Sequence, residues 1–215
     1  MDYLKERELL VEYGNKLMEY GLTKGTGGNL SIYDDKKGYM IITPSGIEFD
    51  KLTPQDMVVM NLEGDIISGE KKPSSEYMMH TMIYKDRKDI KSVVHAHTMY
   101  ATVISCLRQK LPAVHYMIAL AGKDVRCAEY ATFGTEELAK NAVEAMKDRN
   151  AVLLANHGII AGSKNIQNAF NIIDEVEYCA AIYYRTKCIG NPIILDDEEM
   201  KIMEGKFQTY GQIRD

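Results

Sequence analysis

The chain has 215 residues, a net charge of −5 and ordinary fractions of apolar (46%) and charged (27%) side chains. This length suits one domain with a sizeable core, so we expect a single domain over residues 1–215. The acidic balance, without a long basic run, argues against a nucleic-acid partner. No apolar run approaches the roughly 20 residues that cross a bilayer, and the charged N-terminus lacks the apolar stretch of a signal peptide. We therefore expect a cytoplasmic protein with no membrane partner.

The four cysteines show neither a metal-binding nor a disulfide pattern. They stand at positions 106, 127, 179 and 188, no pair has CxxC spacing, and three have apolar neighbours. We expect all of them to be reduced packing residues.

The first part of the chain predicts one helix followed by antiparallel strands. Apolar residues recur at steps near 3.6 over residues 2–20, which predicts an amphipathic helix capped by Asp2 and ended by Gly21. Two hairpins should follow, with strands over 30–33, 39–43, 57–61 and 65–68.

Two loops among these strands offer polar groups to a ligand. Residues 24–31 hold three glycines within four positions, so the loop can adopt unusual backbone angles and its amides could bind a phosphate. Most loops of this kind are only turns, and the spacing matches no nucleotide-binding motif. Thr43-Pro44-Ser45-Gly46 offers a second turn, with hydroxyls and a glycine amide.

A helix is expected to begin at Pro73-Ser74-Ser75-Glu76 and to run to about Tyr84. Either serine could cap this helix, or both could bind an anion at its N-terminus. Glu76 should fall in the first turn, with His80 one turn further along. This spacing could bind a metal, but it is not the HExxH pattern, and a packed or surface His80 is the simpler interpretation.

Two buried strands of the second part lead into histidines. Residues 92–97 predict a strand whose period of two places His95 and His97 on one face. Residues 151–155 predict another, followed by Asn156-His157-Gly158 and a further strand over 159–161. Helices are expected over 99–106, 136–147, 166–188 and 196–207.

These elements predict an α/β fold with an α+β-like, three-layer arrangement. Strands with helices between and after them favour a central, mainly antiparallel sheet covered by helices. No internal repeat or convincing linker divides the chain.

Three of the five histidines follow apolar strands, namely His95, His97 and His157. A catalytic zinc ion typically takes three protein ligands and keeps one position open. Any one of these histidines could simply be packed in the core. The H-x-H pair together with a third histidine at a strand end favours a metal site.

Seven motifs of this chain together resemble the class II aldolase and epimerase superfamily, and most closely its L-fuculose-1-phosphate aldolase branch. The match covers nearly the whole chain and includes the closing segment 206–211. The motifs, in order, are Gly27-Gly28-Asn29-Leu30-Ser31, Thr43-Pro44-Ser45-Gly46, Pro73-Ser74-Ser75-Glu76, His95-Ala96-His97, His115-Tyr116-Met117-Ile118, Tyr130-Ala131-Thr132-Phe133-Gly134-Thr135 and Asn156-His157-Gly158.

The resemblance implies a role for each matched residue. One zinc ion per subunit would be held by His95, His97 and His157, with Glu76 as the fourth ligand at rest and the acid/base in turnover. Tyr116 and Tyr210 would approach from a neighbouring subunit of a four-fold homotetramer, and Phe133 would shape an aldehyde pocket. The substrate phosphate would lie among Gly28, Asn29, Ser45, Gly46, Ser74 and Ser75.

The implied reaction is the reversible cleavage of L-fuculose 1-phosphate, or a similar ketose 1-phosphate, to dihydroxyacetone phosphate and L-lactaldehyde or a related aldehyde. Breaking a carbon–carbon bond next to a ketone leaves an enediolate, whose charge zinc stabilises as a Lewis acid. Glu76 suits the proton transfer at carbon, and Tyr116 suits the one at the aldehyde oxygen.

Several alternatives remain open at the level of sequence. A pentulose-5-phosphate 4-epimerase of the same superfamily shares the zinc and phosphate motifs, but it carries an aspartate where residues 114–117 have no acid. An aldolase for a 5-deoxypentulose 1-phosphate differs by few pocket residues. A Schiff-base aldolase needs a desolvated lysine, and no apolar strand here contains one. A scaffold domain, as in the adducin head, lacks the metal ligands.

Overall fold

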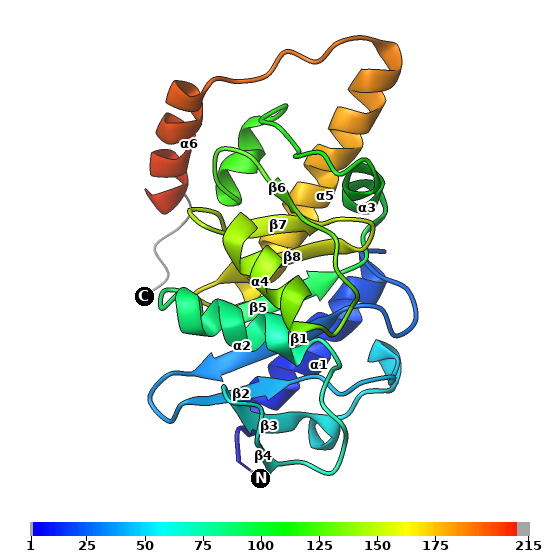
Figure 1. Cartoon of the computed structure of the whole chain (residues 1–215), viewed down its shortest axis with the longest axis vertical. Coiled ribbons are helices and arrows are strands. Elements are labelled where there is room, and N and C mark those ends of the chain that lie inside the picture. Colours follow the sequence, from blue (N-terminus) through cyan, green and yellow to red (C-terminus); the bar gives the residue numbers. More distant parts are fainter. Residues whose placement is uncertain (1, 210–215) are drawn as a thin grey trace.

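The computed structural model describes residues 2–209, and its centre is one sheet of eight strands in the order β4-β3-β2-β1-β5-β8-β7-β6 (Figure 1). All neighbouring strands are antiparallel except β6 and β7, which run parallel. The prediction of a mainly antiparallel sheet is confirmed. The strands are β1 (Asn29–Asp34), β2 (Tyr39–Ile42), β3 (Val58–Asn61), β4 (Ile66–Ser68), β5 (Ser92–Ala96), β6 (Arg126–Ala128), β7 (Ala151–Leu154) and β8 (Gly158–Ser163).

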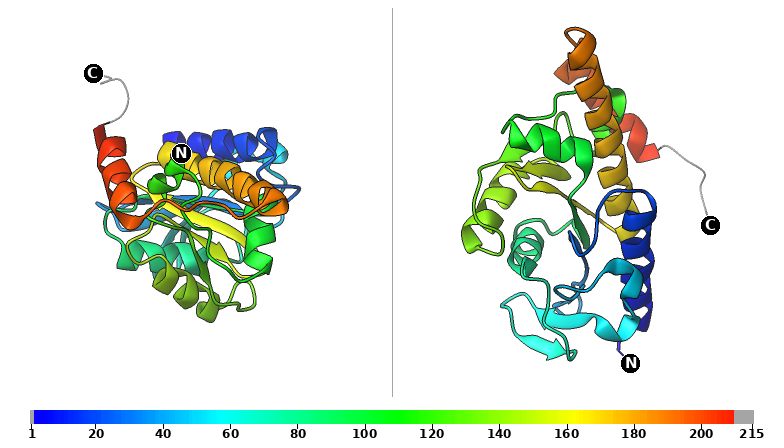
Figure 2. Two further views of the ribbon diagram at one scale, coloured as in Figure 1. Left: turned by 90° about the horizontal axis from the view of Figure 1, so that it is seen from above. Right: turned by 90° about the vertical axis from the view of Figure 1, so that its right-hand side faces the viewer.

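Helices cover both faces of the sheet, as the left view of Figure 2 shows. The helix α1 and the long helix α5 lie on one face, and α2 and α4 lie on the other, which gives the three expected layers. The helices are α1 (Leu4–Glu19), α2 (Tyr77–Asp86), α3 (Met99–Cys106), α4 (Glu136–Ala145), α5 (Ile166–Ile189) and α6 (Asp197–Thr209), with short 3-10 turns η1 (Phe49–Lys51), η2 (Pro54–Asp56) and η3 (Tyr116–Leu120).

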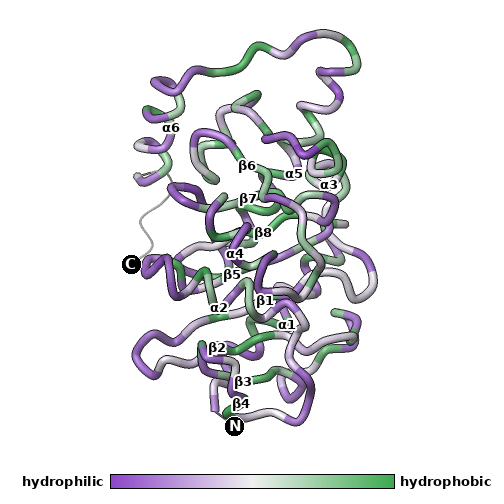
Figure 3. The backbone as a smooth tube through the Cα atoms, in the orientation of Figure 1, coloured by the Kyte–Doolittle hydropathy of each residue, from purple (hydrophilic) through white to green (hydrophobic). Residues whose placement is uncertain are grey.

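Strand alternation divides the apolar side chains between two cores. In β5, Val94 and Ala96 join the core beneath α1, α3 and α5, whereas Val93 joins the core beneath α2 and α4. The period of two therefore turns His95 toward the α2 layer. Figure 3 shows hydrophobic stretches in strands such as β2, β3 and β8, and hydrophilic stretches in several of the turns.

The structure corrects several sequence-based boundaries. β5 ends at Ala96, so His97 lies just beyond the strand. α1 begins at Leu4 after a left-handed Tyr3 (φ 62°), not after an Asp2 cap. α2 begins at Tyr77, so Glu76 occupies the N-cap position and neither preceding serine caps the helix.

The structure also contains a strand that the sequence does not predict, and it corrects the expectation for two cysteines. The strand is β6 (Arg126–Ala128), whose three residues are too few to show a period of two. The cysteines are all free, as expected, but Cys106 and Cys188 are exposed, so they do not pack in the core. No helix within residues 2–209 is long and apolar enough to cross a bilayer.

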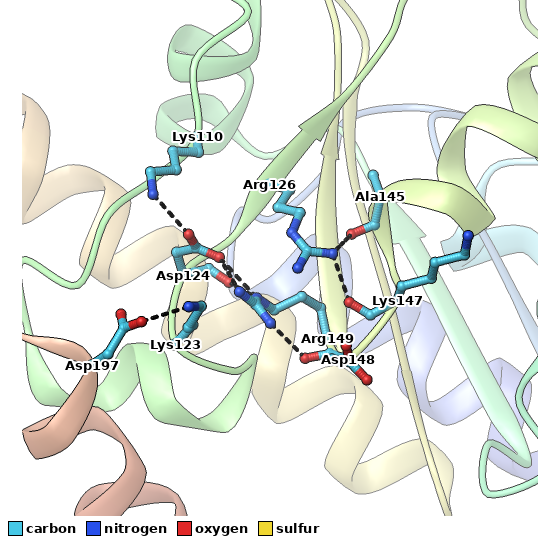
Figure 4. A network of polar contacts seen from close by, with 9 residues as sticks. All are labelled: Lys110, Lys123, Asp124, Arg126, Ala145, Lys147, Asp148, Arg149 and Asp197. Carbon is cyan, nitrogen blue, oxygen red and sulfur yellow. Dashed lines mark hydrogen bonds and ion pairs between the residues drawn. The ribbon is translucent and has the colours of Figure 1, made fainter.

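A buried ion pair fixes the chain around the short strand β6 (Figure 4). The Arg149 side chain donates from Nε to Asp124 Oδ1 at 2.8 Å, and its Nη2 lies 2.7 Å from the same oxygen. Lys110 donates to the second oxygen of Asp124 at 2.9 Å. Arg126 donates to the carbonyl oxygens of Ala145 and Lys147, which attaches the end of α4 to β6. These contacts fix the edge of the sheet from which the loop over residues 129–135 departs.

A carboxylate from α5 caps helix α3, which begins two residues after His97. Thr98 holds the N-cap position but makes no side-chain cap bond. Instead, Glu177 accepts from the amides of Tyr100 at 2.7 Å and Ala101 at 2.8 Å. The unpaired amides and the positive end of the helix dipole both favour a carboxylate there. The contact therefore ties the segment that carries His97 to the longest helix.

Replacing this cap should weaken the fold measurably. We expect Glu177→Ala to lower the free energy of unfolding by about 1–2 kcal/mol, because two helix amides lose their charged acceptor. Glu8→Ala, which changes an exposed glutamate of α1, is the matched control and should change it by less than about 0.5 kcal/mol. Denaturant titration measures both values; equal losses in the two variants would contradict the capping role.

Candidate metal centre and active site

Four side chains meet at the end of β5. One nitrogen from each of His95, His97 and His157 and one oxygen of Glu76 all lie within 4.8 Å of one another. Nε2 of His95 lies 3.1 Å from Nε2 of His97 and 3.3 Å from Oε2 of Glu76. Nε2 of His157 lies 3.4 Å from Oε1 of Glu76. The residues come from β5 and the position just after it, the turn between β7 and β8, and the N-cap position of α2, so three separate segments build one cluster.

Two glycines allow these segments to approach so closely. Gly28, just before β1, has φ +85°, and a Cβ atom there would collide with the carbonyl oxygen of His95. A Cβ atom on Gly158, at the start of β8, would lie 2.5 Å from the carbonyl oxygen of Ala96. A side chain at either position would push a neighbouring strand away from the histidines.

Hydrogen bonding and burial prepare the histidines for a metal. His95 Nδ1 donates to the carbonyl oxygen of Ile159 at 2.8 Å, so its Nε2 faces the cluster. Burial, reinforced by the nearby His95, lowers the pKa of His97 and of His157 to about 4. Both rings are therefore neutral at pH 7, which is the form that binds metal.

Glu76 and His95 form the charged part of the cluster. Burial by itself would raise the pKa of Glu76, but the charge and hydrogen bond of His95, followed by His157 and Asn29, outweigh it and hold that pKa far below its usual value. Burial would lower the pKa of His95, but the Glu76 carboxylate reverses this and raises it. A metal ion bound here would therefore replace the proton on His95, next to the ionised carboxylate of Glu76.

An unpaired buried atom supports the fit of a cation. Oε1 of Glu76 is buried and has no hydrogen-bond partner among the described residues. Such an oxygen is costly unless a proton donor or a cation satisfies it. Three imidazole nitrogens and one carboxylate oxygen are a donor set that suits a divalent transition metal such as zinc.

A cavity of about 520 Å³ opens directly beside the cluster. It brings together every expected phosphate and aldehyde residue that the structure describes. Those residues are Gly28, Asn29, Ser45, Gly46, Ser74, Ser75 and Phe133. Glu76, His97 and His157 form the floor that the cavity shares with the metal cluster, and no lysine or arginine of the described chain lines it.

The loops that carry Ser45 and Ser74 are joined by an isolated antiparallel β-bridge between Pro44 and Pro73. The Ser45 amide donates to the Lys72 carbonyl oxygen, and the Ser74 amide to the Thr43 carbonyl oxygen, each at 3.0 Å. These amides are therefore committed to the backbone. The Ser74 hydroxyl accepts from the Glu76 amide at 3.3 Å, so its own proton can still be donated. Serine hydroxyls are thus better placed than these two amides to bind an anion.

Tyr116, one of the two tyrosines implied by the resemblance, lies away from this cavity. Tyr116, on η3, is 45% exposed and does not line the cavity beside the cluster. Its ring stacks on Phe207 of α6, with centroids 6.2 Å apart. Tyr210 lies outside the described residues.

Some neighbours of the site were not identified from the sequence. Tyr130 and Asn156 line the cavity, and Arg108 contacts both, donating to Asn156 Oδ1 at 3.1 Å and lying 5.7 Å from the centre of the Tyr130 ring. Tyr130 and Asn156 belong to motifs already singled out, so their position within those motifs was a usable signal. For Arg108 the sequence offered no such signal.

Comparison with known proteins gives the family. The model of the class II aldolase and adducin N-terminal domain matches residues 8–184. The chain is 54% identical over 208 residues to 5-deoxy-D-ribulose 1-phosphate aldolase of Bacillus thuringiensis serovar kurstaki, covering 97% of this chain and 98% of the relative. It is 43% identical to L-fuculose phosphate aldolase of Escherichia coli K12, covering 98% of each. A solved structure of L-fuculose 1-phosphate aldolase superposes with a TM-score of 0.94 at 58% identity, covering 95% of this chain and 96% of that one. The chain therefore belongs to the class II aldolase family and is an aldehyde-lyase of that class.

Proposed function

We propose that this enzyme cleaves a ketose 1-phosphate to dihydroxyacetone phosphate and a short aldehyde. The observation that carries the proposal is the place of Glu76, whose carboxylate belongs to the metal cluster and also lines the cavity that holds the phosphate-site serines. A ketose 1-phosphate can span this cavity, with its phosphate at the serine hydroxyls and its carbonyl group beside the histidines. The epimerase and scaffold alternatives have less support, because the relatives named above are aldolases.

The metal in this proposal is zinc, held by His95, His97, His157 and Glu76. A divalent metal there supplies a Lewis acid for the negative charge that develops beside the ketone during cleavage. Glu76 is the group that moves a proton at the substrate carbon, since its carboxylate is buried beside the cavity and retains an unpaired oxygen. The hydroxyls of Ser45, Ser74 and Ser75 position the phosphate without a cationic side chain from the described part of the same chain.

The aldehyde end of the cavity favours small, weakly polar products. Phe133, Tyr130 and Ala131 line that region. A 5-deoxypentulose 1-phosphate would release a two-carbon aldehyde, and L-fuculose 1-phosphate would release L-lactaldehyde. We propose that both are cleaved, because a relative at 54% identity is named for 5-deoxy-D-ribulose 1-phosphate and a solved structure at 58% identity is named for L-fuculose 1-phosphate.

Tyr116 completes the site only if a second subunit provides it. Within one chain its ring lies on η3 against α6, away from the cavity beside the cluster. We propose a cyclic homotetramer in which Tyr116, and Tyr210 near the tail, reach the cavity of a neighbouring subunit. Tyr116 then handles the proton at the aldehyde oxygen, for which a neutral phenol is suited.

Removing the metal should abolish cleavage and weaken the protein. We expect near one zinc ion per chain, and activity and thermal midpoint should both fall after treatment with a chelator and return on addition of zinc. An ion at 100 times its dissociation constant adds about 2.7 kcal/mol of stability. His157→Ala should lose the ion, whereas His115→Ala, outside the cluster, should keep it. Full activity in protein that elemental analysis shows to be free of metal would contradict the proposal.

A substrate panel tests the reaction itself. Release of dihydroxyacetone phosphate should be detected from both 5-deoxyribulose 1-phosphate and L-fuculose 1-phosphate. Interconversion of pentulose 5-phosphates without release of a three-carbon phosphate would replace the aldolase with the epimerase. Phe133→Ala should change the ratio of the two kcat/KM values, because Phe133 lines the proposed aldehyde region. In the reverse, synthetic direction it should have a smaller effect on the KM for dihydroxyacetone phosphate.

Coexpression of two inactive variants tests the shared site. Tyr116→Phe and Glu76→Gln should each be strongly impaired alone. In a random mixed tetramer roughly a quarter of the sites combine an intact Glu76 with an intact Tyr116 from the neighbour. The mixture should therefore regain roughly a quarter of the activity of the wild type. Activity no higher than the mean of the two parents would place Tyr116 outside the neighbour's reaction.

A further inference from the structure

A row of buried polar side chains leads away from Glu76 into the protein. Asn29, Ser31, His80 and Tyr84 are each at most 3% exposed. Asn29 Nδ2 donates to Glu76 Oε2 at 3.0 Å. The other end of this row lies between β1 and α2, where water does not reach it. His80 lies one helical turn beyond Glu76, the N-cap residue of α2, but it is not part of the metal cluster.

His80 joins the two halves of the row. Its Nε2 lies 2.5 Å from Asn29 Oδ1, and its Nδ1 lies 2.6 Å from Ser31 Oγ. Ser31 Oγ in turn lies 2.6 Å from the hydroxyl of Tyr84. The row therefore runs from Tyr84 through Ser31, His80 and Asn29 to the carboxylate.

The direction of every bond in the row follows from the carboxylate. An ionised Glu76 can only accept, so Asn29 must turn its NH2 group toward it and its carbonyl oxygen toward His80. His80 must then carry its proton on Nε2 and accept at Nδ1. Because Ser31 Oγ has to supply the proton to Nδ1, the Tyr84 hydroxyl donates to Ser31 Oγ, and the same hydroxyl also lies 3.1 Å from the Ser31 carbonyl oxygen.

We propose that His80 is a positioning residue for Glu76, fixing the Asn29 amide through a one-way row of hydrogen bonds that starts at Tyr84. The inference rests on the proposed function of Glu76 as the group that moves a proton. Without His80, the Asn29 carbonyl oxygen loses its donor, so the Asn29 side chain can turn away and its NH2 group is no longer held against the carboxylate. Glu76 then loses the donor that holds it in place between the metal cluster and the cavity.

The surroundings keep this row in one protonation state. Burial, with a smaller contribution from His95, lowers the pKa of His80 to about 3, so the ring stays neutral. Burial raises the pKa of Tyr84, so its hydroxyl stays protonated and remains a donor. The row can therefore hold one orientation at neutral pH, rather than deliver a proton.

Steady-state kinetics of substitutions along the row give the first test. His80→Leu should lower kcat about 10- to 100-fold, as for residues that orient a metal ligand, while KM and zinc content stay near those of the wild type. His80→Gln, which keeps one donor and one acceptor, should recover most of kcat. Tyr84→Phe, at the far end, should lose less than His80→Leu. An unchanged kcat in folded His80→Leu, or equal losses in His80→Leu and Tyr84→Phe, would overturn the inference.

A double-substitution cycle separates positioning from a general loss of stability. If His80 acts through Glu76, adding His80→Leu to Glu76→Ala should lower the residual rate little further. Losses that multiply in the double variant would show that His80 acts independently of Glu76.

Nitrogen NMR of the metal-free wild-type protein tests the row without any measurement of activity. The ring of His80 should show a protonated Nε2 and an unprotonated Nδ1, and a proton on Nδ1 would overturn the inference. If the protein cleaves none of the ketose phosphates, the proposed function fails, and the position of the His80 proton still decides whether the row exists.

Discussion

The site depends on close packing of the backbone around the end of β5. Gly28 and Gly158 lie on either side of this strand, at β1 and β8, where a Cβ atom would collide with the carbonyl oxygens of His95 and Ala96. Because the three segments approach so closely, the imidazoles of His95 and His97 can face Glu76 and His157 within 4.8 Å. The sheet and its covering helices fix these segments, and α3 and α5 fix the chain that leaves the cluster.

The electrostatic design follows from burying four titratable groups together. The histidines at 97 and 157 are kept neutral, and the remaining charge is shared by Glu76 and His95. A divalent cation would satisfy the carboxylate oxygen that has no hydrogen bond and would replace the proton on His95. The serine-lined part of the cavity, by contrast, offers hydroxyls and no cationic side chain from residues 2–209. Under the proposed function, a phosphorylated ligand would lie across the cavity with its phosphate at these hydroxyls.

Sequence patterns predicted the parts of this arrangement that depend on local chemistry. The period of two in β5, the glycine-rich loop and the serine turn all identified residues that line the site. They could not predict that β5 ends before His97, because the end of a strand depends on its partners, and the pairing of β5 with β8 stops at Ala96. They missed β6, whose pairing with β7 is a contact between segments distant in sequence.

The same limit applies to His80 and Tyr116. The one-turn spacing of Glu76 and His80 suggested either a metal pair or a packed histidine, but only the position of β1 reveals Asn29 between them. Tyr116 belonged to a motif of the family, yet its place on η3 separates it from the cavity of its own chain. Contacts between chains leave no period or spacing in the sequence, so its role there is a proposal.

We propose that Glu76, His95, His97 and His157 hold the ion on which cleavage depends. Crystals of the zinc-loaded protein, measured at wavelengths on both sides of the zinc absorption edge, test it most directly. The account predicts one strong anomalous peak per chain, enclosed by His95, His97, His157 and Glu76. A cluster without a peak, or zinc bound only at other residues of a protein that still releases dihydroxyacetone phosphate, would contradict it.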